Sequence, residues 1–227
     1  MICFDTQGDD EKYLIATSEQ PICGFHKDEW IPSSELPKRY AGYSTCFRKE
    51  AGSSGRDVWG IFRVHQFEKV EQFMITECDI ESSQKAQEEM LAVAEEFYQS
   101  LGLSYKVITI VSGELNNAAT KKYDLEAWFP GYEEYRELVS CSNCTDYQSR
   151  AMNIRTGTPE EKKHVHMLNS TLCATTRTLS CLIENYQTPH GVHVPEVLVP
   201  FMGGITHIPY VREMPVVAVK KTKAKKK

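Results

Sequence analysis

The sequence predicts an α+β fold, in which a mixed and largely antiparallel sheet is flanked by helices. Strand-like segments follow one another through turns, without the regular strand–helix–strand alternation of parallel sheets. Two segments, 82–101 and 172–186, place apolar residues at helical spacing. The 227 residues are 41% hydrophobic and 25% charged, as in an average globular protein, and fit one large domain or two small ones. Disordered, collagen-like and coiled-coil classes are thereby excluded.

The first predicted elements are short. Residues 1–11 are polar and predict a flexible lead-in. Residues 13–16 have the apolar character of a short buried strand. A helix-like stretch follows Pro21 at 22–27, and the prolines after it indicate a loop.

Two strand-like runs, 43–50 and 60–74, come next, and a linker rich in glycine and serine, 51–57, joins them. This pattern predicts a long antiparallel hairpin. Side chains alternate between the two faces of a strand, so one face of the second run combines cations, an aromatic ring and a carboxylate. That face contains Arg63, His65, Phe67, Lys69 and Glu71, and the facing strand adds Cys46, Arg48 and Glu50.

The chemistry of this hairpin face leaves two interpretations open. Two guanidiniums suit a polyphosphate, an aromatic ring suits a stacked base, and a carboxylate suits an ammonium group. A solvated outer face crossed by salt bridges between strands would have the same composition. Spacing alone favours the solvated face.

The segment 82–101 predicts a long helix, with Ser82 or Ser83 as N-cap and Gly102 just beyond its end. One side of this helix is apolar and is expected to pack on the sheet. That side consists of Ala86, Met90, Val93, Ala94, Phe97 and Leu101.

Three strands and a second helix complete the predicted fold. The strands are expected at 105–111, 125–129 and 136–141, with a turn at Pro130-Gly131 between the last two. The helix is expected at 172–186. Its apolar positions are Leu172, Thr176, Leu179, Ile183 and Tyr186.

The net charge of −5 is unevenly distributed along the chain. Six lysines lie within 220–227, so residues 1–219 hold 20 basic against 31 acidic side chains, a net charge of −11. A body of this sign is a poor general phosphate binder, so nucleic acid would have to meet local patches or the tail. The sequence has no run of about eighteen apolar residues and no signal-peptide pattern, so an intracellular protein without a membrane span is expected.

Eight cysteines at irregular spacings indicate reduced thiols that pack as small side chains. Cys141 and Cys144 form a lone CxxC, and no further ligand pair follows at zinc spacing, so no structural zinc is expected. His164 and His166 could share a strand face but lack a third donor. Phosphate-loop, dinucleotide-binding and nucleophile-elbow motifs are absent from the sequence.

Four segments, 17–19, 44–50 with 60–71, 136–146 and 168–179, closely resemble seryl-tRNA synthetases, and they occur in the same order. The resemblance extends from about Glu11 to Pro215, and the Lys-rich ending is similar to the eukaryotic cytosolic form. It implies a class II synthetase catalytic domain, whose motif 2 matches the hairpin and whose motif 3 matches 168–186. The implied activity is ATP-dependent activation of L-serine to seryl-adenylate and transfer to tRNA(Ser), in the cytoplasm.

The resemblance also implies roles for single residues. Arg48 would grip the α-phosphate and the serine carboxylate, Glu50 would read the adenine amino group, and Phe67 would stack under adenine. Arg63 and Arg177 would meet the outer phosphates, so that these three arginines are the implied catalytic cations. The implied ATP-binding set is Arg48, Glu50, Arg63, Val64, Phe67, Glu137, Ser140 and Arg177.

The implied serine pocket contains Thr17, Glu19, Arg48, Glu71 and Asn169. Glu137 and Ser140 are the implied ligands of ATP-bound Mg²⁺. Strict alternation would place Glu137 and Ser140 on opposite faces of a strand, so a bulge or a strand end has to re-aim one of them if both are ligands. In-line attack of a carboxylate on phosphorus needs positioning and cations rather than a general base.

The match departs from the family in several places. The family's tRNA-binding coiled-coil arm and motif 1, which builds its homodimer interface, lie upstream of the matched region, so an N-terminally truncated catalytic domain is expected. Trp59 and Ala151 stand where the family usually has arginines. The expected layout is a lead-in at 1–11, a catalytic domain at 12–215 and a Lys-rich tail at 216–227. Two hypotheses remain: a catalytic part of the enzyme, or a non-charging paralogue that binds nucleotide, serine or a synthetase subunit.

Overall fold

The structure is a computed structural model that describes residues 2–4, 12–50, 55–58, 60–158 and 160–212. Contacts within the chain divide it into two compact units, Met1–Asn185 and Tyr186–Lys227, where the sequence predicted one domain over 12–215. In the described part of the chain, no helix has the length and apolar character needed to cross a membrane. The Lys-rich tail at 216–227 lies outside the described residues.

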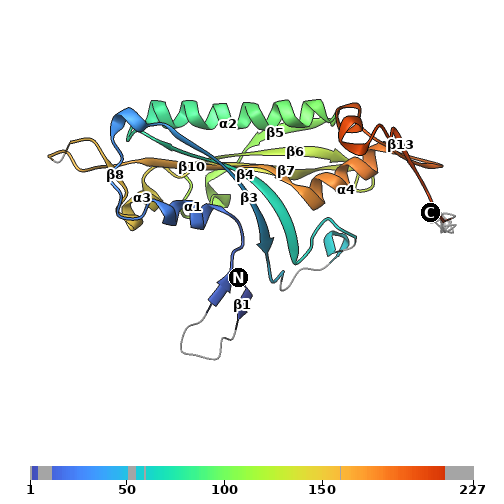
Figure 1. The fold of residues 1–227 in the computed structure, drawn as a ribbon, viewed down its shortest axis with the longest axis horizontal. Helices are drawn as coiled ribbons and strands as arrows, with labels where there is room; N and C mark the ends of the chain where they lie inside the picture. The colour runs from blue at the N-terminus through green and yellow to red at the C-terminus, as the bar shows by residue number, and fades with distance from the viewer. Residues whose placement is uncertain (1, 5–11, 51–54, 59, 159, 213–227) are drawn as a thin grey trace, which may run out of the picture. The chain divides into compact units, whose positions relative to one another are not determined.

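The first unit is built around a six-stranded sheet in which every neighbouring pair is antiparallel. This arrangement confirms the predicted α+β fold with a largely antiparallel sheet (Figure 1). The strands, in their order across the sheet, are β3 (Lys38–Phe47), β4 (Gln66–Thr76), β10 (His166–Ala174), β7 (Glu134–Asn143), β6 (Lys121–Phe129) and β5 (Tyr105–Thr109).

The predicted hairpin is present, but its strands differ in extent from the prediction. β3 pairs with β4 from Lys38 to Phe47, so it begins earlier than expected, and β4 begins only at Gln66. Residues 60–65, predicted as strand, are therefore irregular. One reason is Gly60, whose φ of +65° is incompatible with extended backbone. A 3₁₀ turn, η2 (Arg56–Val58), lies in the connection.

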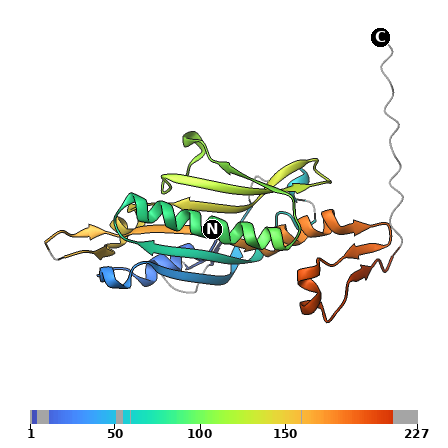
Figure 2. The ribbon, with the colours of Figure 1, turned by 90° about the horizontal axis from the view of Figure 1, so that it is seen from above.

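The long helix α2 (Ile80–Ser100) covers one face of this sheet (Figures 1 and 2). Its N-cap is Asp79, whose carboxylate accepts a 2.7 Å hydrogen bond from the Ser82 backbone N–H, so the predicted serine caps are wrong. Gly102, with φ of +67°, follows the last turn as predicted.

The buried side of α2 is rotated from the predicted one. Ala86, Met90 and Ala94 are buried as expected, but Val93 is 43% exposed. Gln87, which the apolar pattern did not include, is buried instead of Val93. Its side-chain amide donates to the carbonyls of Lys121 and Cys141 at 3.2 and 3.1 Å. A hydrogen-bonded amide can thus occupy a position that a purely apolar pattern assigns to an aliphatic residue.

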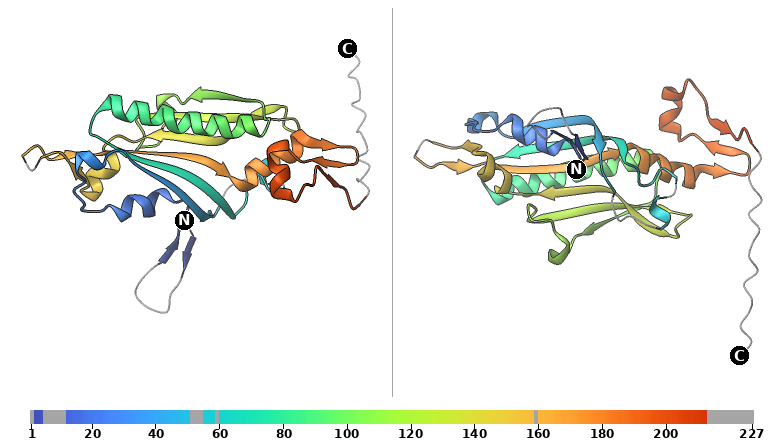
Figure 3. Two further views of the ribbon diagram at one scale, coloured as in Figure 1. Left: turned by 45° about the horizontal axis from the view of Figure 1, so that its top comes forward. Right: turned by 90° about the horizontal axis from the view of Figure 1, so that it is seen from below.

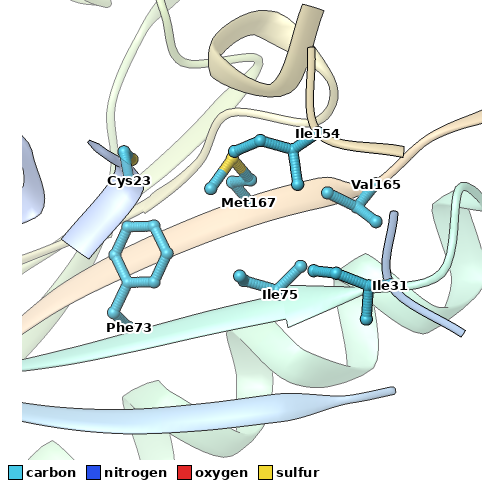
Figure 4. Close-up of a cluster of buried hydrophobic side chains, with 7 residues drawn as sticks. All are labelled: Cys23, Ile31, Phe73, Ile75, Ile154, Val165 and Met167. Carbon is cyan, nitrogen blue, oxygen red and sulfur yellow. The ribbon is translucent and has the colours of Figure 1, made fainter. Parts of the chain in front are cut away.

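Alternate residues of β4 supply two separate hydrophobic clusters. Met74 packs under α2 with Met90 and Leu168, whereas Phe73 and Ile75 point to the opposite face. The opposite cluster is closed by residues from α1 (Glu19–Phe25), from the segment after α3 (Tyr147–Met152) and from the loop at Ile31 (Figures 3 and 4). That cluster consists of Cys23, Ile31, Phe73, Ile75, Ile154, Val165 and Met167.

The second predicted helix is shorter than expected. The sequence assigned Leu172 to it, but Leu172 belongs to β10, and α4 spans Thr175–Tyr186. Leu179 and Ile183, predicted on its apolar side, are exposed, and the buried residues are Thr178, Cys181 and Leu182. Two of these three buried side chains are small, so the spacing of large apolar residues in the sequence does not mark this interface.

The remaining elements are short. β1 (Ile2–Phe4) pairs with β2 (Lys12–Leu14), where a flexible lead-in and a buried strand were predicted, and Tyr13 is exposed. The helix predicted at 22–27 is present as α1, which begins at Glu19, and the strand predicted at 105–111 is present as β5. The strands predicted at 125–129 and 136–141 are present as β6 and β7, which begin earlier, at Lys121 and Glu134. The other short elements of the first unit are η1 (Ser33–Glu35), η3 (Ser112–Glu114), β8 (Arg155–Thr156) and β9 (Lys163–His164). The second unit contains β11 (Gln187–Thr188), β12 (Gly191–His193), η4 (Glu196–Met202) and β13 (His207–Pro209).

Candidate active site

A cleft lies over the sheet face that is not covered by α2. Its floor includes Phe67 and Lys69 of β4, which share the face of Phe73 because side chains two residues apart point the same way. Seven of the predicted residues line it: Arg48, Glu50, Arg63, Val64, Phe67, Glu137 and Arg177. The cleft also contains Lys69 and Thr171, for which the sequence predicted no binding role.

Arg48 is held by the end of the hairpin. Its backbone N–H donates to the carbonyl of His65 at 2.8 Å, which continues the pairing beyond β3 and β4. A ring nitrogen of His65 lies 3.2 Å from the Arg48 carbonyl oxygen. The Arg48 guanidinium then lies over the ring of Phe67, 5.1 Å from its centroid. His65 thus orients the main chain of Arg48 and is itself exposed.

Glu50 and Arg63 face one another across the connection of the hairpin. Arg63 Nη1 lies 2.9 Å from Glu50 Oε2, and Arg63 Nη2 lies 3.9 Å from Asp57 Oδ2. Glu50 has a φ of +48°, a left-handed conformation that few residues other than glycine adopt. Such backbone strain is found where the surrounding structure requires a side chain to point in one direction. Here it aims the Glu50 carboxylate at Arg63.

Arg177 enters the cleft from the first turn of α4. Its guanidinium is 4.9 Å from the ring centroid of Phe62, and its Nη1 donates to the Glu137 carbonyl at 3.2 Å. Burial lowers the pKa of Arg177, and Arg63, Arg48 and Arg136 lower it further, against the opposing effect of Glu137. Several guanidiniums therefore converge on one region, which favours a ligand with several negative charges.

Phe62 and Arg136 are parts of this site that the sequence prediction missed. The guanidiniums of Arg136 and Arg177 both contact the Phe62 ring, each 4.9 Å from its centroid. Arg136 Nη2 donates to Asp57 Oδ2 at 2.6 Å. Strand alternation assigned Phe62 to the face opposite Arg63, but because 60–65 is not a strand, both line the cleft. The only sequence signal for Arg136 was its place in a matched segment.

A bulge re-aims Glu137, as the sequence analysis required if both it and Ser140 are ligands. Leu125 of β6 is opposite Val139, and the next residue, Glu126, is opposite Glu137, so β7 has one extra residue at this point. Glu137 and Ser140 consequently reach the same face. Burial and the nearby Glu137 raise the pKa of Asp124, whereas Lys122 and Ser140 lower it.

These oxygen atoms provide the chemistry that Mg²⁺ prefers. Two carboxylates, Asp124 and Glu137, and one hydroxyl, Ser140, lie together. Among the described residues no group of three or more His, Cys, Asp and Glu side chains could hold a metal ion alone. Lys122 Nζ lies 3.3 Å from Asp124 Oδ1, so one of the two carboxylates has a cationic partner within the chain.

Three of the residues predicted for an amino-acid pocket are in mutual contact. Thr17 Oγ1 donates to Glu71 Oε2 at 2.9 Å and also contacts the Glu19 carboxylate. Lys69 contacts Glu71, and its Nζ lies 3.8 Å from Glu19 Oε1. Burial raises the pKa of Glu71 to about 7 and Glu19 adds to this, while Lys69 acts in the opposite direction. The pocket is thus a buried site with an excess of carboxylate.

Asn169 lies one step further along the same face. On β10, Thr171 is opposite Glu71 and Asn169 is opposite Phe73, so Asn169 is a diagonal neighbour of Glu71. Its side-chain amide lies 3.8 Å from the Cys144 sulfur. The structure therefore places Glu71 and Asn169 on one face of β4 and β10, where Thr17 contacts Glu71 and Glu19.

Two further expectations concern cysteines and family departures. Cys141 packs in the cluster under α2 and Cys144 beside Asn169, and burial raises their pKa values to about 12 and about 11. Their different surroundings fit packed thiols.

Trp59 lies outside the described residues, and Arg150, which precedes Ala151, pairs with Asp146 at 3.0 Å on the surface.

An antiparallel sheet with a cluster of arginines on its open face is the arrangement of a class II aminoacyl-tRNA synthetase core. Residues 3–186 match the tRNA synthetase class II core domain (G, H, P, S and T), and the chain belongs to this family. A cytoplasmic serine–tRNA ligase from Schizosaccharomyces pombe is 64% identical over 214 residues, which are 92% of this chain and 47% of that protein. The chain thus spans about half the length of the curated relatives it matches.

Solved structures give the same relationship. The cytoplasmic serine–tRNA ligase from Naegleria fowleri in complex with AMP has a TM-score of 0.89 and 57% identity, covering 93% of this chain and 50% of that one. The seryl-tRNA synthetase from Pyrococcus horikoshii complexed with ATP has a TM-score of 0.85 and 44% identity, covering 92% and 47%. The fold of the first unit is therefore the class II synthetase fold.

Proposed function

We propose that this chain is the catalytic part of a serine–tRNA ligase, which activates L-serine with ATP to seryl-adenylate and transfers the seryl group to tRNA(Ser). The observation that supports this most directly is the position of an arginine cluster beside the Thr17, Glu19 and Glu71 contacts on one sheet face. A polyphosphate and an ammonium group could bind there next to each other. The high identity to serine–tRNA ligases is consistent with both halves of the site.

ATP is proposed to bind in the cleft. Arg48 would contact the α-phosphate, and Arg63 and Arg177 the outer phosphates. Glu50 would accept a hydrogen bond from the adenine amino group, and Phe67 would provide the stacking surface, with Val64 beside them. The relatives whose structures contain AMP and ATP support nucleotide binding by this fold.

L-serine is proposed to bind at Thr17, Glu19, Glu71 and Asn169, with its carboxylate towards Arg48. The carboxylate then attacks the α-phosphorus in line, the bond from the α-phosphorus to the bridging oxygen of the β-phosphate breaks, and pyrophosphate leaves. Arg48 would stabilise the negative charge that increases in the transition state. Mg²⁺ at Glu137 and Ser140 would neutralise charge on the phosphates. The chain's own residues orient the two reactants, which is the larger part of catalysis in phosphoryl-type transfers.

The macromolecular partners are part of the same proposal. The relatives are named cytoplasmic serine–tRNA ligases, so tRNA(Ser) and a cytoplasmic location are proposed for the whole protein. A homodimer is proposed as well, on the resemblance to the family alone. Residues 1–219 have a net charge of −11, so contact with tRNA is expected at local basic groups rather than over the whole surface.

Serine-dependent exchange of pyrophosphate into ATP tests the proposal. We expect Arg48→Ala to lower the exchange rate at saturating ATP by about a hundredfold, in the range observed when one oxyanion donor is removed. Arg39→Ala is the matched control, because Arg39 lies on β3, the strand that leads to Arg48, but pairs with Glu89 of α2 at 2.8 Å. Equal effects of the two substitutions would contradict the proposed role of Arg48.

Amino-acid selectivity is the second test. The polar set Thr17, Glu19, Glu71 and Asn169 should reject alanine by about ten-thousand-fold or more, because alanine leaves buried polar groups without a partner. The assay compares exchange with serine and with alanine, and calorimetry with a non-hydrolysable seryl-adenylate analogue measures binding directly. Similar rates for alanine and serine would refute the assignment of the pocket.

A further inference from the structure

Lys69 is a buried lysine inside the amino-acid pocket. It is 5% exposed, and its ammonium group contacts Glu71 and lies 3.8 Å from Glu19 Oε1. Lysine is seldom buried to this extent unless it is paired, because desolvation of its charge is costly. Its position in the middle of the pocket therefore indicates a function for its charge.

The charges around Glu71 can be counted. Lys69 lies beside it on β4, and Glu19 and Thr17 face it from the segment at the start of α1. On the two neighbouring strands, the residues opposite Glu71 are Gly42 and Thr171, which are uncharged. Two carboxylates and one ammonium thus leave a net charge of −1 in a buried site. A ligand with one ammonium group would neutralise it.

We propose that Lys69 is a positioning residue of the amino-acid pocket, whose charge keeps Glu71 ionised so that Glu19 and Glu71 retain one negative charge for the α-ammonium group of the amino acid. This inference rests on the proposed function, since it concerns how the same pocket binds serine. Without Lys69, the two carboxylates that share the Thr17 hydroxyl would repel each other, and Glu71 would take up a proton. A protonated Glu71 cannot pair with an ammonium group.

The pH dependence of ligand binding should reveal this role. The pKa of Glu71 is raised to about 7, mainly by burial, and Lys69 is the group that opposes this rise. Glu71 is therefore ionised above about pH 7 and protonated below it. Removal of Lys69 should move this titration to higher pH.

The first experiment measures the titration of Glu71 in the 227-residue chain. Carbon-13 NMR of labelled glutamate carboxyls follows each group, and Glu71→Gln identifies the signal. We expect Lys69→Met to raise the pKa of Glu71, Lys69→Gln to do the same with a neutral hydrogen-bonding side chain, and Lys69→Arg to leave it near the wild-type value. Lys106→Met is the control, because Lys106 pairs with Glu126 at 3.0 Å outside the pocket. An unchanged Glu71 pKa in both neutral variants would overturn the proposal.

The second experiment measures the serine affinity by calorimetry between pH 6 and pH 9. In the wild type the affinity should fall below about pH 7, where Glu71 becomes protonated. In Lys69→Met the affinity at pH 7 should fall about tenfold for each unit by which the Glu71 pKa rises, and it should recover at pH 9. A general structural defect would lower affinity equally at every pH.

Two outcomes separate this inference from the proposed function. If the wild type binds serine and Lys69→Met has the same pH profile but weaker ATP binding, Lys69 acts on the phosphates and the inference alone is wrong. If the wild type binds no serine at any pH, the proposed function fails and the inference fails with it.

Discussion

Glu71 should make the stability of the protein depend on pH in a direction opposite to that of most carboxylates. Its side chain is 1% exposed, and burial raises its pKa from 4.5 to about 7. Between these values the folded state binds a proton that the unfolded state has already released. The stabilising contribution of Glu71 is therefore complete below about pH 4.5 and is lost as the pH rises through about 7.

The size of this effect follows from the shift. A difference of one pKa unit corresponds to about 1.4 kcal/mol, so a rise from 4.5 to about 7 predicts a loss of about 3 kcal/mol in the free energy of unfolding. Glu71→Gln removes the titrating group. The variant also loses the ion pair with Lys69, but the pH dependence of that pair is already contained in the Glu71 pKa of about 7.

Urea unfolding at pH 5 and pH 8, followed by tryptophan fluorescence, measures the effect. Relative to Glu71→Gln, the wild type should lose about 2.5 kcal/mol in the free energy of unfolding between pH 5 and pH 8, which is most of the total loss of about 3 kcal/mol. Glu68→Gln is the matched control, because Glu68 lies on the exposed face of the same strand and contacts Tyr43. The reasoning would be refuted if the difference in unfolding free energy between the wild type and Glu71→Gln stayed constant with pH. It would also be refuted if the wild type became the more stable of the two on going from pH 5 to pH 8.

The remaining predictions concern α2 and its contacts. Met90→Ala should cost about 2–5 kcal/mol in the free energy of unfolding because it opens a cavity under the helix, whereas Val93→Ala on its exposed side should change it by about 0.5 kcal/mol or less. If chemical denaturation gave equal losses of unfolding free energy for Met90→Ala and Val93→Ala, the buried side of α2 would be the one predicted from the sequence, which includes Val93. Tyr98→Phe should cost about 1–2 kcal/mol in the same assay, because the Tyr98 hydroxyl donates to the Leu172 carbonyl at 3.1 Å and lies 3.2 Å from Thr178 Oγ1. If the denaturation midpoint of Tyr98→Phe equalled that of the wild type, water would be replacing the Tyr98 hydroxyl in the variant.

The part of the site that lies on a regular strand could be predicted from the sequence. Phe67, Lys69 and Glu71 share one face of β4 because the period of two holds from Gln66 onwards. Arg63 and Glu50 lie outside the strands, and their pairing depends on the left-handed backbone of Glu50. The alternation of side chains along a strand therefore placed Arg63 and Glu50 on the correct face, although neither residue lies in a strand.

Other parts could not be predicted because they depend on tertiary contacts. Gln87 replaces Val93 on the buried side of α2 through hydrogen bonds to two other strands. The exclusion of Phe62 from the site followed from treating 60–65 as strand. Lys69 and Glu71 are neighbours on one strand face, but the second carboxylate beside Lys69 belongs to Glu19, a residue 50 positions away in the sequence. No local pattern contains this information.

Side chains of β4 alternate between the two faces of the sheet, and this limits which mutations the strand can accept. Odd-numbered residues such as Lys69, Glu71 and Phe73 serve the open face, and Met74 serves the face under α2. A substitution alters one of these functions at one position. The loss or gain of a single codon within the strand would instead transfer every following side chain to the wrong face, sending charged groups under α2 and core residues into the cleft. Length changes in this strand should therefore be far less tolerated than amino-acid replacements.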